Sequence, residues 1–148
     1  MIANFTMGII FSADLANVYL LRKDHPEFQA GLLNGVGGKL EPGETYADCM
    51  AREGKEEGRY TGDWNHLGSM RGNTEGWGEY QCEVFYSVME KKTKEPRTTE
   101  KEPIEMHPVA DLPALIFQMV PHLPMLIMAS LAHHAAKPED KFSLTLEY

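Results

Sequence analysis

The stretch GGKLEPGETYADCMAREGKEEGRY, Gly37–Tyr60, joins a glycine-rich loop to an acidic segment that has the pattern of a helix. Thr45 can cap a helix over residues 45–58, because Asp48 follows three residues later at the spacing of a capping box. Glu53, Glu56 and Glu57 then fall within about 100° of one another, since positions i, i+3 and i+4 share a face. Such a face is usually solvated, but a bound cation would also explain three neighbouring carboxylates.

A second face of the same helix carries very small side chains, namely Ala47, Ala51, Gly54 and Gly58. Gly54 inside a helix costs about 1 kcal/mol relative to alanine, so we expect a packing reason for it. Close approach of this face to its neighbour would hold the glutamates low over the glycine-rich loop. Hard divalent cations such as Mg²⁺ prefer carboxylate oxygens. The stretch therefore predicts a magnesium site that can also bind phosphate oxygens of a substrate.

Length and charge narrow the class of protein. The 148 residues suit one domain spanning 1–148. The net charge of -8 argues against binding to duplex nucleic acid, which needs a basic surface. Cys49 and Cys82 form no CxxC pair and indicate reduced thiols in a cytoplasmic protein. The apolar region 112–132 is interrupted by prolines, so we expect no membrane span and no membrane partner.

The rest of the chain predicts a mixed, α+β order of elements. Two strands at 5–12 and 17–23 can form a hairpin, and the segment 24–30 is expected to be a loop. Later segments are, in order, an irregular strand and loop (31–44), two strands (64–72 and 79–89) joined by a turn (73–78), a mobile loop (91–103), a short strand (104–110), one or two helices (114–135) interrupted at 121–124, and an edge strand (142–148).

The acidic helix and its preceding loop carry a long pattern at fixed offsets. Gly38, five residues, Glu44, seven residues, Arg52-Glu53, two residues and Glu56-Glu57 stand in that order. This pattern resembles the signature of the Nudix hydrolases. The resemblance implies a Nudix-type α/β/α sandwich around a mixed β-sheet, which agrees with the order of elements above.

Three positions depart from the signature. Gly54 stands where an aliphatic residue is usual, Arg59 where the second glycine is usual, and Tyr60 where the final aliphatic is usual. Gly58 can still supply the left-handed conformation that ends a helix. We therefore expect the helix to end one residue early with its glutamates in place.

The resemblance also implies an activity, the hydrolysis of a nucleoside diphosphate linked to another group X. Glu53, Glu56 and Glu57 would hold Mg²⁺, with Mn²⁺ as an alternative, and the Gly38 carbonyl would complete the coordination. The metal lowers the pKa of a bound water that attacks phosphorus. Arg52 would orient the carboxylates through a bidentate contact, unless it makes only an exposed helix salt bridge.

Family members often use one more acidic residue from a later loop, as a metal ligand or a base. The candidates here are Glu100, Glu102 and Glu105, of which we favour Glu102. The alternative is that all of them are solvated charges of the loop.

Substrate-binding residues are suggested by the segment Asn34–Lys39, which resembles the corresponding segment of members that cleave nucleoside triphosphates. Asn34 would contact the base, unless it is a turn residue. Lys39, Arg22 and Lys23 would meet phosphates, unless they are surface charges. We expect Glu44 to lie beside this binding region and to support its residues rather than to bind the metal. The remaining candidates for the base pocket are Phe5, Phe117, His122 and Met125, although we expect core packing for Met125.

The resemblance therefore implies a Mg²⁺-dependent enzyme that cleaves a nucleoside triphosphate, normal or oxidised, to the monophosphate and pyrophosphate. The marks of the NADH, ADP-ribose, dinucleoside polyphosphate and coenzyme A subclasses are absent; Glu75 stands where ADP-ribose members carry proline. A nucleotide sugar, another dinucleotide and a 5′-triphosphate RNA end stay open as substrates. So does a Nudix domain that senses a nucleotide without cleaving it. The base, the attacked phosphorus and a homodimer are left undecided.

Overall fold

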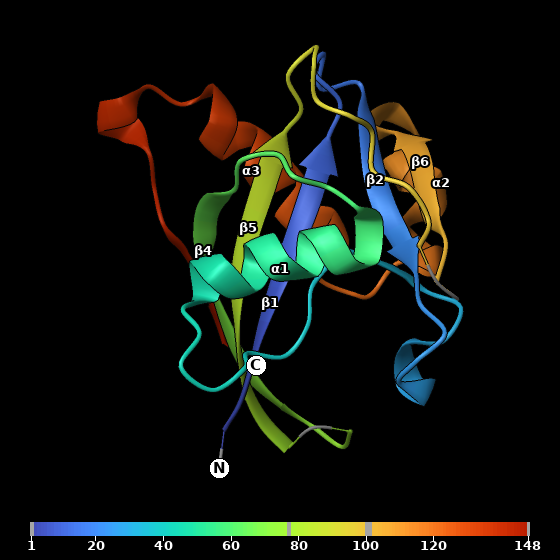
Figure 1. Ribbon diagram of the computed structural model, residues 1–148, viewed down its shortest axis with the longest axis vertical. Coiled ribbons are helices and arrows are strands. Elements are labelled where there is room, and N and C mark those ends of the chain that lie inside the picture. The colour runs from blue at the N-terminus through green and yellow to red at the C-terminus, as the bar shows by residue number, and fades with distance from the viewer. Residues whose placement is uncertain (1, 77, 100–101, 148) are drawn as a thin grey trace.

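The computed structural model describes residues 2–76, 78–99 and 102–147. A seven-stranded mixed sheet is covered by α1 on one face and by α3 on the other (Figure 1). The predicted α+β class and the α/β/α sandwich are therefore confirmed. The strands are β1 (Ala3–Phe11), β2 (Asn17–Arg22), β3 (Leu33–Asn34), β4 (Asn65–Thr74), β5 (Gly78–Val88), β6 (Ile104–Pro108) and β7 (Leu144–Glu147). The helices are α1 (Tyr46–Gly58), α2 (Leu112–Leu115) and α3 (Leu123–Ala135), with 3₁₀ turns η1 (Glu27–Gln29), η2 (Val109–Asp111), η3 (Ile116–Gln118) and η4 (Pro138–Asp140).

The centre of the sheet is the parallel pair of β1 and β5, in register from Ala3 opposite Tyr80 to Phe11 opposite Val88. Residues 6–11 of β1 are all buried. Ile9 belongs to the core under α3, whereas Ile10 belongs to the core under α1. A strand covered on both faces has this continuous apolar sequence, because alternate side chains enter opposite cores.

The strands β1 and β2 form the predicted hairpin near their turn and then separate. Their paired residues are Ile10 with Tyr19 and Phe11 with Val18. Beyond this point the glycine-rich loop lies against β1, where the Thr6 N–H donates to the Gly38 carbonyl at 2.9 Å. A Cβ on Gly37 would collide with the Thr6 carbonyl. Only glycine therefore allows the loop to run this close to β1.

The helix α1 begins as predicted, because the Thr45 hydroxyl accepts a hydrogen bond from the Asp48 N–H at 3.1 Å. The prediction for its end is wrong. Arg59, and not Gly58, adopts the left-handed conformation, with φ 51°. Gly58 stays helical and its carbonyl accepts the Arg97 N–H at 2.9 Å. The helix therefore keeps the full length of the signature.

The small-residue face of α1 packs closely only in its second half. Gly54 lies against the indole of Trp64, and a Cβ there would come within 3.1 Å of the ring. Ala47, in contrast, is exposed. The missing aliphatic residue at position 54 is thus replaced in the core by a tryptophan from the segment that follows the helix.

The other predicted elements are found with small changes in their bounds. The β4–β5 hairpin and β6 are present, and β7 pairs in parallel with β4 at the edge of the sheet. The apolar region divides into α2 and α3 around Pro121. The described residues of the predicted loop at 91–103 contain neither helix nor strand; Glu100 and Lys101, like Trp77 in the predicted turn, lie outside the described residues. None of the described helices is long and apolar enough to cross a membrane.

Candidate active site

Two glutamates of α1 lie directly over the glycine-rich loop. The Glu53 side chain is 12% exposed, and a Cβ on Gly38 would collide with its carboxylate. The Glu57 carboxylate accepts the Gly37 N–H at 2.6 Å. Glu56 is exposed at the rim of the same cleft. The loop glycines therefore make room for the carboxylates and, at Gly37, also bind one.

Arg52 connects the loop to these carboxylates. Its guanidinium makes a bidentate contact with Glu44, at 2.7 and 3.0 Å, and donates to Glu53 at 2.9 Å and to Glu56 at 3.1 Å. It also donates to the Lys39 carbonyl at 3.1 Å. The hydrogen bond from Arg52 lowers the pKa of Glu44 to about 2. Glu44 thus stays ionised and holds the arginine that in turn positions Glu53 and Glu56.

Burial determines the electrostatics of the two covered glutamates. It raises the pKa of Glu57 to about 7, although the Gly37 N–H and Lys23 favour the ionised form. Burial also raises the pKa of Glu53, against the effect of Arg52. Carboxylates that are hard to ionise alone become favourable ligands once a cation is present. Glu53, Glu56 and Glu57 thus supply the kind of oxygen ligand that a hard divalent cation prefers. The Gly38 carbonyl accepts the Thr6 N–H and keeps a second lone pair.

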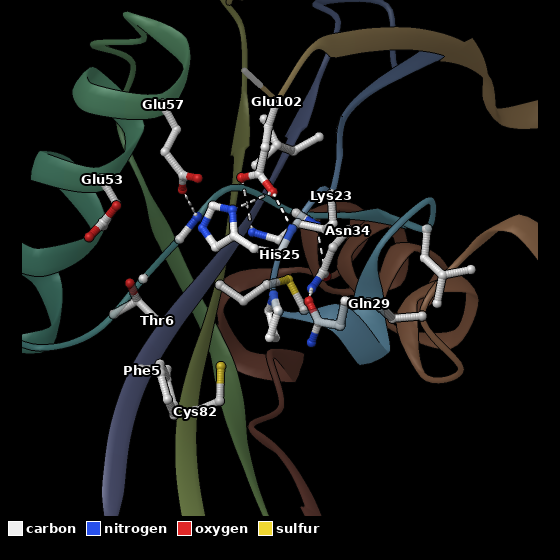
Figure 2. Close-up of a pocket in the computed structure, with 18 of the residues that line it drawn as sticks. Phe5, Thr6, Lys23, His25, Gln29, Asn34, Glu53, Glu57, Cys82 and Glu102 are labelled. Carbon is white, nitrogen blue, oxygen red and sulfur yellow. Dashed lines mark hydrogen bonds and ion pairs between the residues drawn. The ribbon is translucent and has the colours of Figure 1, made fainter. Parts of the chain in front are cut away.

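Glu102 lies on the opposite wall of the cleft, where Figure 2 shows it across from Glu57. Its side chain is 9% exposed and accepts hydrogen bonds from Lys23 Nζ at 3.2 Å and from the Asp24 N–H at 2.7 Å. Its charge helps to raise the pKa of Glu57. Ligand atoms of Asp24, His25 and Glu102 lie within 4.8 Å of one another and could hold a metal ion; among the described residues, the α1 glutamates do not come together this closely.

The other two acidic candidates are not part of this wall. Glu105 pairs with Arg22 through two contacts of 2.7 Å, outside the cleft. Glu100 lies outside the described residues. Among the predicted acids of the later loop, the structure therefore brings only Glu102 toward the α1 carboxylates within the described part of the chain.

The cleft has a volume of about 1190 Å³ and continues past the carboxylates into an apolar end. Asn34 and Gln29 supply amides there, and their side chains lie beside each other in Figure 2. The apolar lining includes Phe5, Phe28, Met70, Tyr80, Cys82 and Val120. The cleft thus joins a charged end to an end that can hold a flat, partly polar ring.

The predicted substrate-binding residues divide into two groups. Asn34 and Lys23 line the cleft, as do the pocket candidates Phe5 and His122. The predicted residues that do not line it are Arg22, Lys39, Glu44, Phe117 and Met125.

Each of the residues outside the cleft has another environment. Arg22 is held by Glu105, Lys39 is exposed, and Glu44 is held by Arg52. Phe117 is 93% exposed. Gln29 and Phe28 were missed because the sequence of residues 24–30 indicates only a loop, and nothing in its spacing marks a binding residue.

Comparisons with known proteins agree with this architecture. The family model described as NUDIX domain matches residues 6–126. The NUDIX domain of Shewanella oneidensis NrtR, solved in complex with ADP ribose, aligns with a TM-score of 0.74 at 14% identity, over 91% of this chain and 90% of that chain. The E. coli ORF135 protein aligns with a TM-score of 0.69 at 19% identity, over 94% and 95%. The mutator MutT protein from Bacillus halodurans aligns with a TM-score of 0.65 at 22% identity, over 99% and 90%. No curated protein sequence matches the chain.

Proposed function

The chain belongs to the Nudix hydrolase family, and we propose that its substrate is a nucleoside triphosphate, which it cleaves to the monophosphate and pyrophosphate. The observation that carries this proposal is the continuity of the cleft. One cavity contains the carboxylates Glu53, Glu56 and Glu57 at one end and an apolar end with amides at the other. A nucleoside triphosphate likewise carries a phosphate chain at one end and a base at the other, so it can lie along the cleft with each part at the matching end.

The charged end would hold the phosphates through a divalent metal ion. Glu53, Glu56 and Glu57 are its proposed ligands, with Glu102 as the additional acid across the cleft. A bound Mg²⁺ or Mn²⁺ neutralises phosphate charge and lowers the pKa of a water molecule. Arg52 keeps Glu53 and Glu56 in position, because its other contacts anchor it to Glu44 and to the loop.

A cationic side chain and an amide would orient the substrate between the two ends. Of the lysines and arginines that the structure describes, Lys23 lines the cleft, so we assign the phosphate contact to it rather than to Arg22 or Lys39. Asn34 lines the base end, and its carbonyl oxygen accepts the Gly35 N–H at 2.8 Å. The amide nitrogen of Asn34 is therefore directed away from the backbone and can donate to a base.

The proposal is tested by measuring pyrophosphate release with Mg²⁺ from a panel of normal and oxidised nucleoside triphosphates. ADP-ribose, NADH and a sugar nucleotide serve as diphosphate-linked competitors, and because their cleavage releases no pyrophosphate, it is followed by chromatography of the monophosphate products. Glu57→Gln is the inactive variant, and Glu75→Gln, on the exposed turn between β4 and β5, is the matched control. Release from triphosphates that Glu57→Gln abolishes supports the proposal. Faster turnover of a diphosphate-linked compound overturns the assigned substrate but not the family's chemistry.

The second candidate is nucleotide binding without turnover. The NUDIX domain of NrtR, complexed with ADP ribose, has this fold, and the chain departs from the signature at Arg59 and Tyr60. Those departures leave α1 at full length. A nucleotide that raises the melting temperature while no compound of the panel is hydrolysed would favour this candidate.

A further inference from the structure

Gln29 is a buried polar side chain at the base end of the cleft. It is 9% exposed and lines the cleft beside Asn34 (Figure 2). Its backbone is fixed on both sides, because its N–H donates to the Pro26 carbonyl and its carbonyl accepts the Leu32 N–H, each at 2.9 Å. A buried amide is normally satisfied by hydrogen bonds, so its partners indicate what it can recognise.

The hydrogen bonds of the two amides fix the direction in which each one faces. Asn34 Oδ1 accepts the Gly35 N–H at 2.8 Å, and Asn34 Nδ2 donates to Gln29 Oε1 at 3.4 Å. Each carbonyl oxygen therefore already accepts a hydrogen bond. Within the described part of the chain, Gln29 Nε2 makes no hydrogen bond and Asn34 Nδ2 makes only the one to Gln29. The remaining protons of both nitrogens form a donor edge in the cleft.

The apolar surroundings of this donor edge make the affinity for a base depend on whether the base accepts hydrogen bonds from it. Phe5, Met70, Tyr80 and Val120 line the same cleft, so a bound ring would exclude water from the amides. An N–H group that is covered and left without an acceptor costs far more than one that faces water. The edge will therefore favour a ring that presents acceptors and disfavour one that presents an amino group.

We propose that Gln29, together with Asn34, selects the base of the substrate by its exocyclic carbonyl oxygen. The O6 and N7 atoms of a 6-oxopurine are two adjacent acceptors and match two adjacent N–H donors. The amino group of a 6-aminopurine would place its own donors against those of Gln29. This inference rests on the proposed function only in requiring that the ligand is a nucleotide.

The test compares inosine triphosphate with ATP, because their bases differ at the 6-position and in the protonation of the neighbouring ring nitrogen. We expect the wild-type kcat/KM to favour inosine triphosphate by about 10- to 100-fold. Gln29→Glu keeps the shape of the side chain and replaces the donor by an acceptor, so the preference should fall at least about tenfold. Gln118→Glu is the matched control, because Gln118 is exposed outside the cleft, and it should leave the ratio unchanged.

A second measurement separates this inference from the proposed function. The affinities of inosine monophosphate and AMP for the wild type and for Gln29→Glu are measured by calorimetry, which requires no turnover. Tighter binding of inosine monophosphate that Gln29→Glu removes supports the inference even if no triphosphate is hydrolysed. Equal use of both triphosphates by the wild type overturns it while the proposed function stands. An equal loss for both substrates in Gln29→Glu also overturns it, because it shows a structural role.

Discussion

The two ends of the cleft differ in how they are held together. At the charged end, the loop and the three α1 glutamates belong to one continuous segment, residues 37–57, in which Arg52 binds Glu44, Glu53 and Glu56, and Gly37 binds Glu57. At the base end, the lining comes from segments far apart in the chain, from Phe5 in β1 to Val120 after η3. Charged side chains and backbone contacts fix the first end, whereas packing of distant elements shapes the second. Substitutions at the charged end should therefore have large effects, and those at the base end graded ones.

The largest effect is expected for Glu53→Gln. Loss of this carboxylate removes one of the three proposed ligands together with a partner of Arg52, so kcat with Mg²⁺ should fall by about 10³-fold. Steady-state kinetics and a thermal melt measure activity and folding separately. If the variant keeps more than about a tenth of the activity, substitutions at the charged end have graded effects as well, and the expected difference between the two ends is wrong.

Gly37→Ala should destabilise the fold itself. A Cβ at this position meets the Thr6 carbonyl, so the loop would have to move away from β1, at a cost of about 2–3 kcal/mol in the free energy of unfolding. Gly43→Ala is the control, because Gly43 has a positive φ but an added Cβ there would lie in open space. This substitution should cost about 1 kcal/mol in the free energy of unfolding. Equal losses in urea unfolding would mean that the contact with β1 is not what fixes the loop.

The pH dependence of the metal-free protein should follow Glu57. Its pKa rises from 4.5 to about 7 on folding, so between these values the folded state binds a proton that the unfolded state has lost. The free energy of unfolding should therefore decrease with rising pH, by about 2 kcal/mol between pH 5 and pH 7. Glu57→Gln should remove this slope in urea titrations with EDTA. A stability that instead increases over this range would contradict the assignment.

Glu44→Gln should weaken metal binding without removing a ligand. Arg52 would lose part of its bidentate contact and hold Glu53 and Glu56 less firmly, so the Mg²⁺ affinity should fall by about tenfold. Activity titrated against Mg²⁺ measures this, and saturating Mg²⁺ should restore most of kcat. Full activity at low Mg²⁺ would show that Glu44 does not contribute to metal binding and that the three α1 carboxylates need no support from it.

The smallest effect is expected for Phe5→Leu at the base end. The leucine keeps apolar contact but loses the flat ring, so KM for a triphosphate should rise about threefold with kcat nearly unchanged. Phe117→Leu, on an exposed side chain outside the cleft, is the control. A fall in kcat as large as that of Glu53→Gln would remove the distinction between the two ends.

This difference also explains which parts could be predicted from the sequence. The Thr45 cap and the helix α1 were predictable because their determinants lie within one short segment. Gln29 was not, because its own hydrogen bonds are local, whereas the cleft that it lines is completed by residues distant in the chain, such as Phe5 and Val120. Met125 illustrates the reverse error, since core packing or a place in the pocket was expected for it, but α3 turns it to the surface.

The end of α1 shows a subtler limit of prediction. Glycine is the usual left-handed residue, yet Arg59 takes this conformation and Gly58 does not. The contact of the Gly58 carbonyl with the Arg97 N–H and the packing of Gly58 beside Pro96 depend on a loop some forty residues later. Local propensity alone therefore placed the end of the helix one residue too early.

The parallel pairing of β1 with β5 has a consequence for how the protein folds during synthesis. Ala3 pairs with Tyr80, so β1 finds its central partner only after the whole acidic helix and β4 have been made. Until then, of its neighbours in the sheet, β1 can pair only with β2 and the glycine-rich loop. Pairings of such long sequence separation form slowly and leave apolar surface exposed. Chaperone dependence of the nascent chain should accordingly end when β5 emerges.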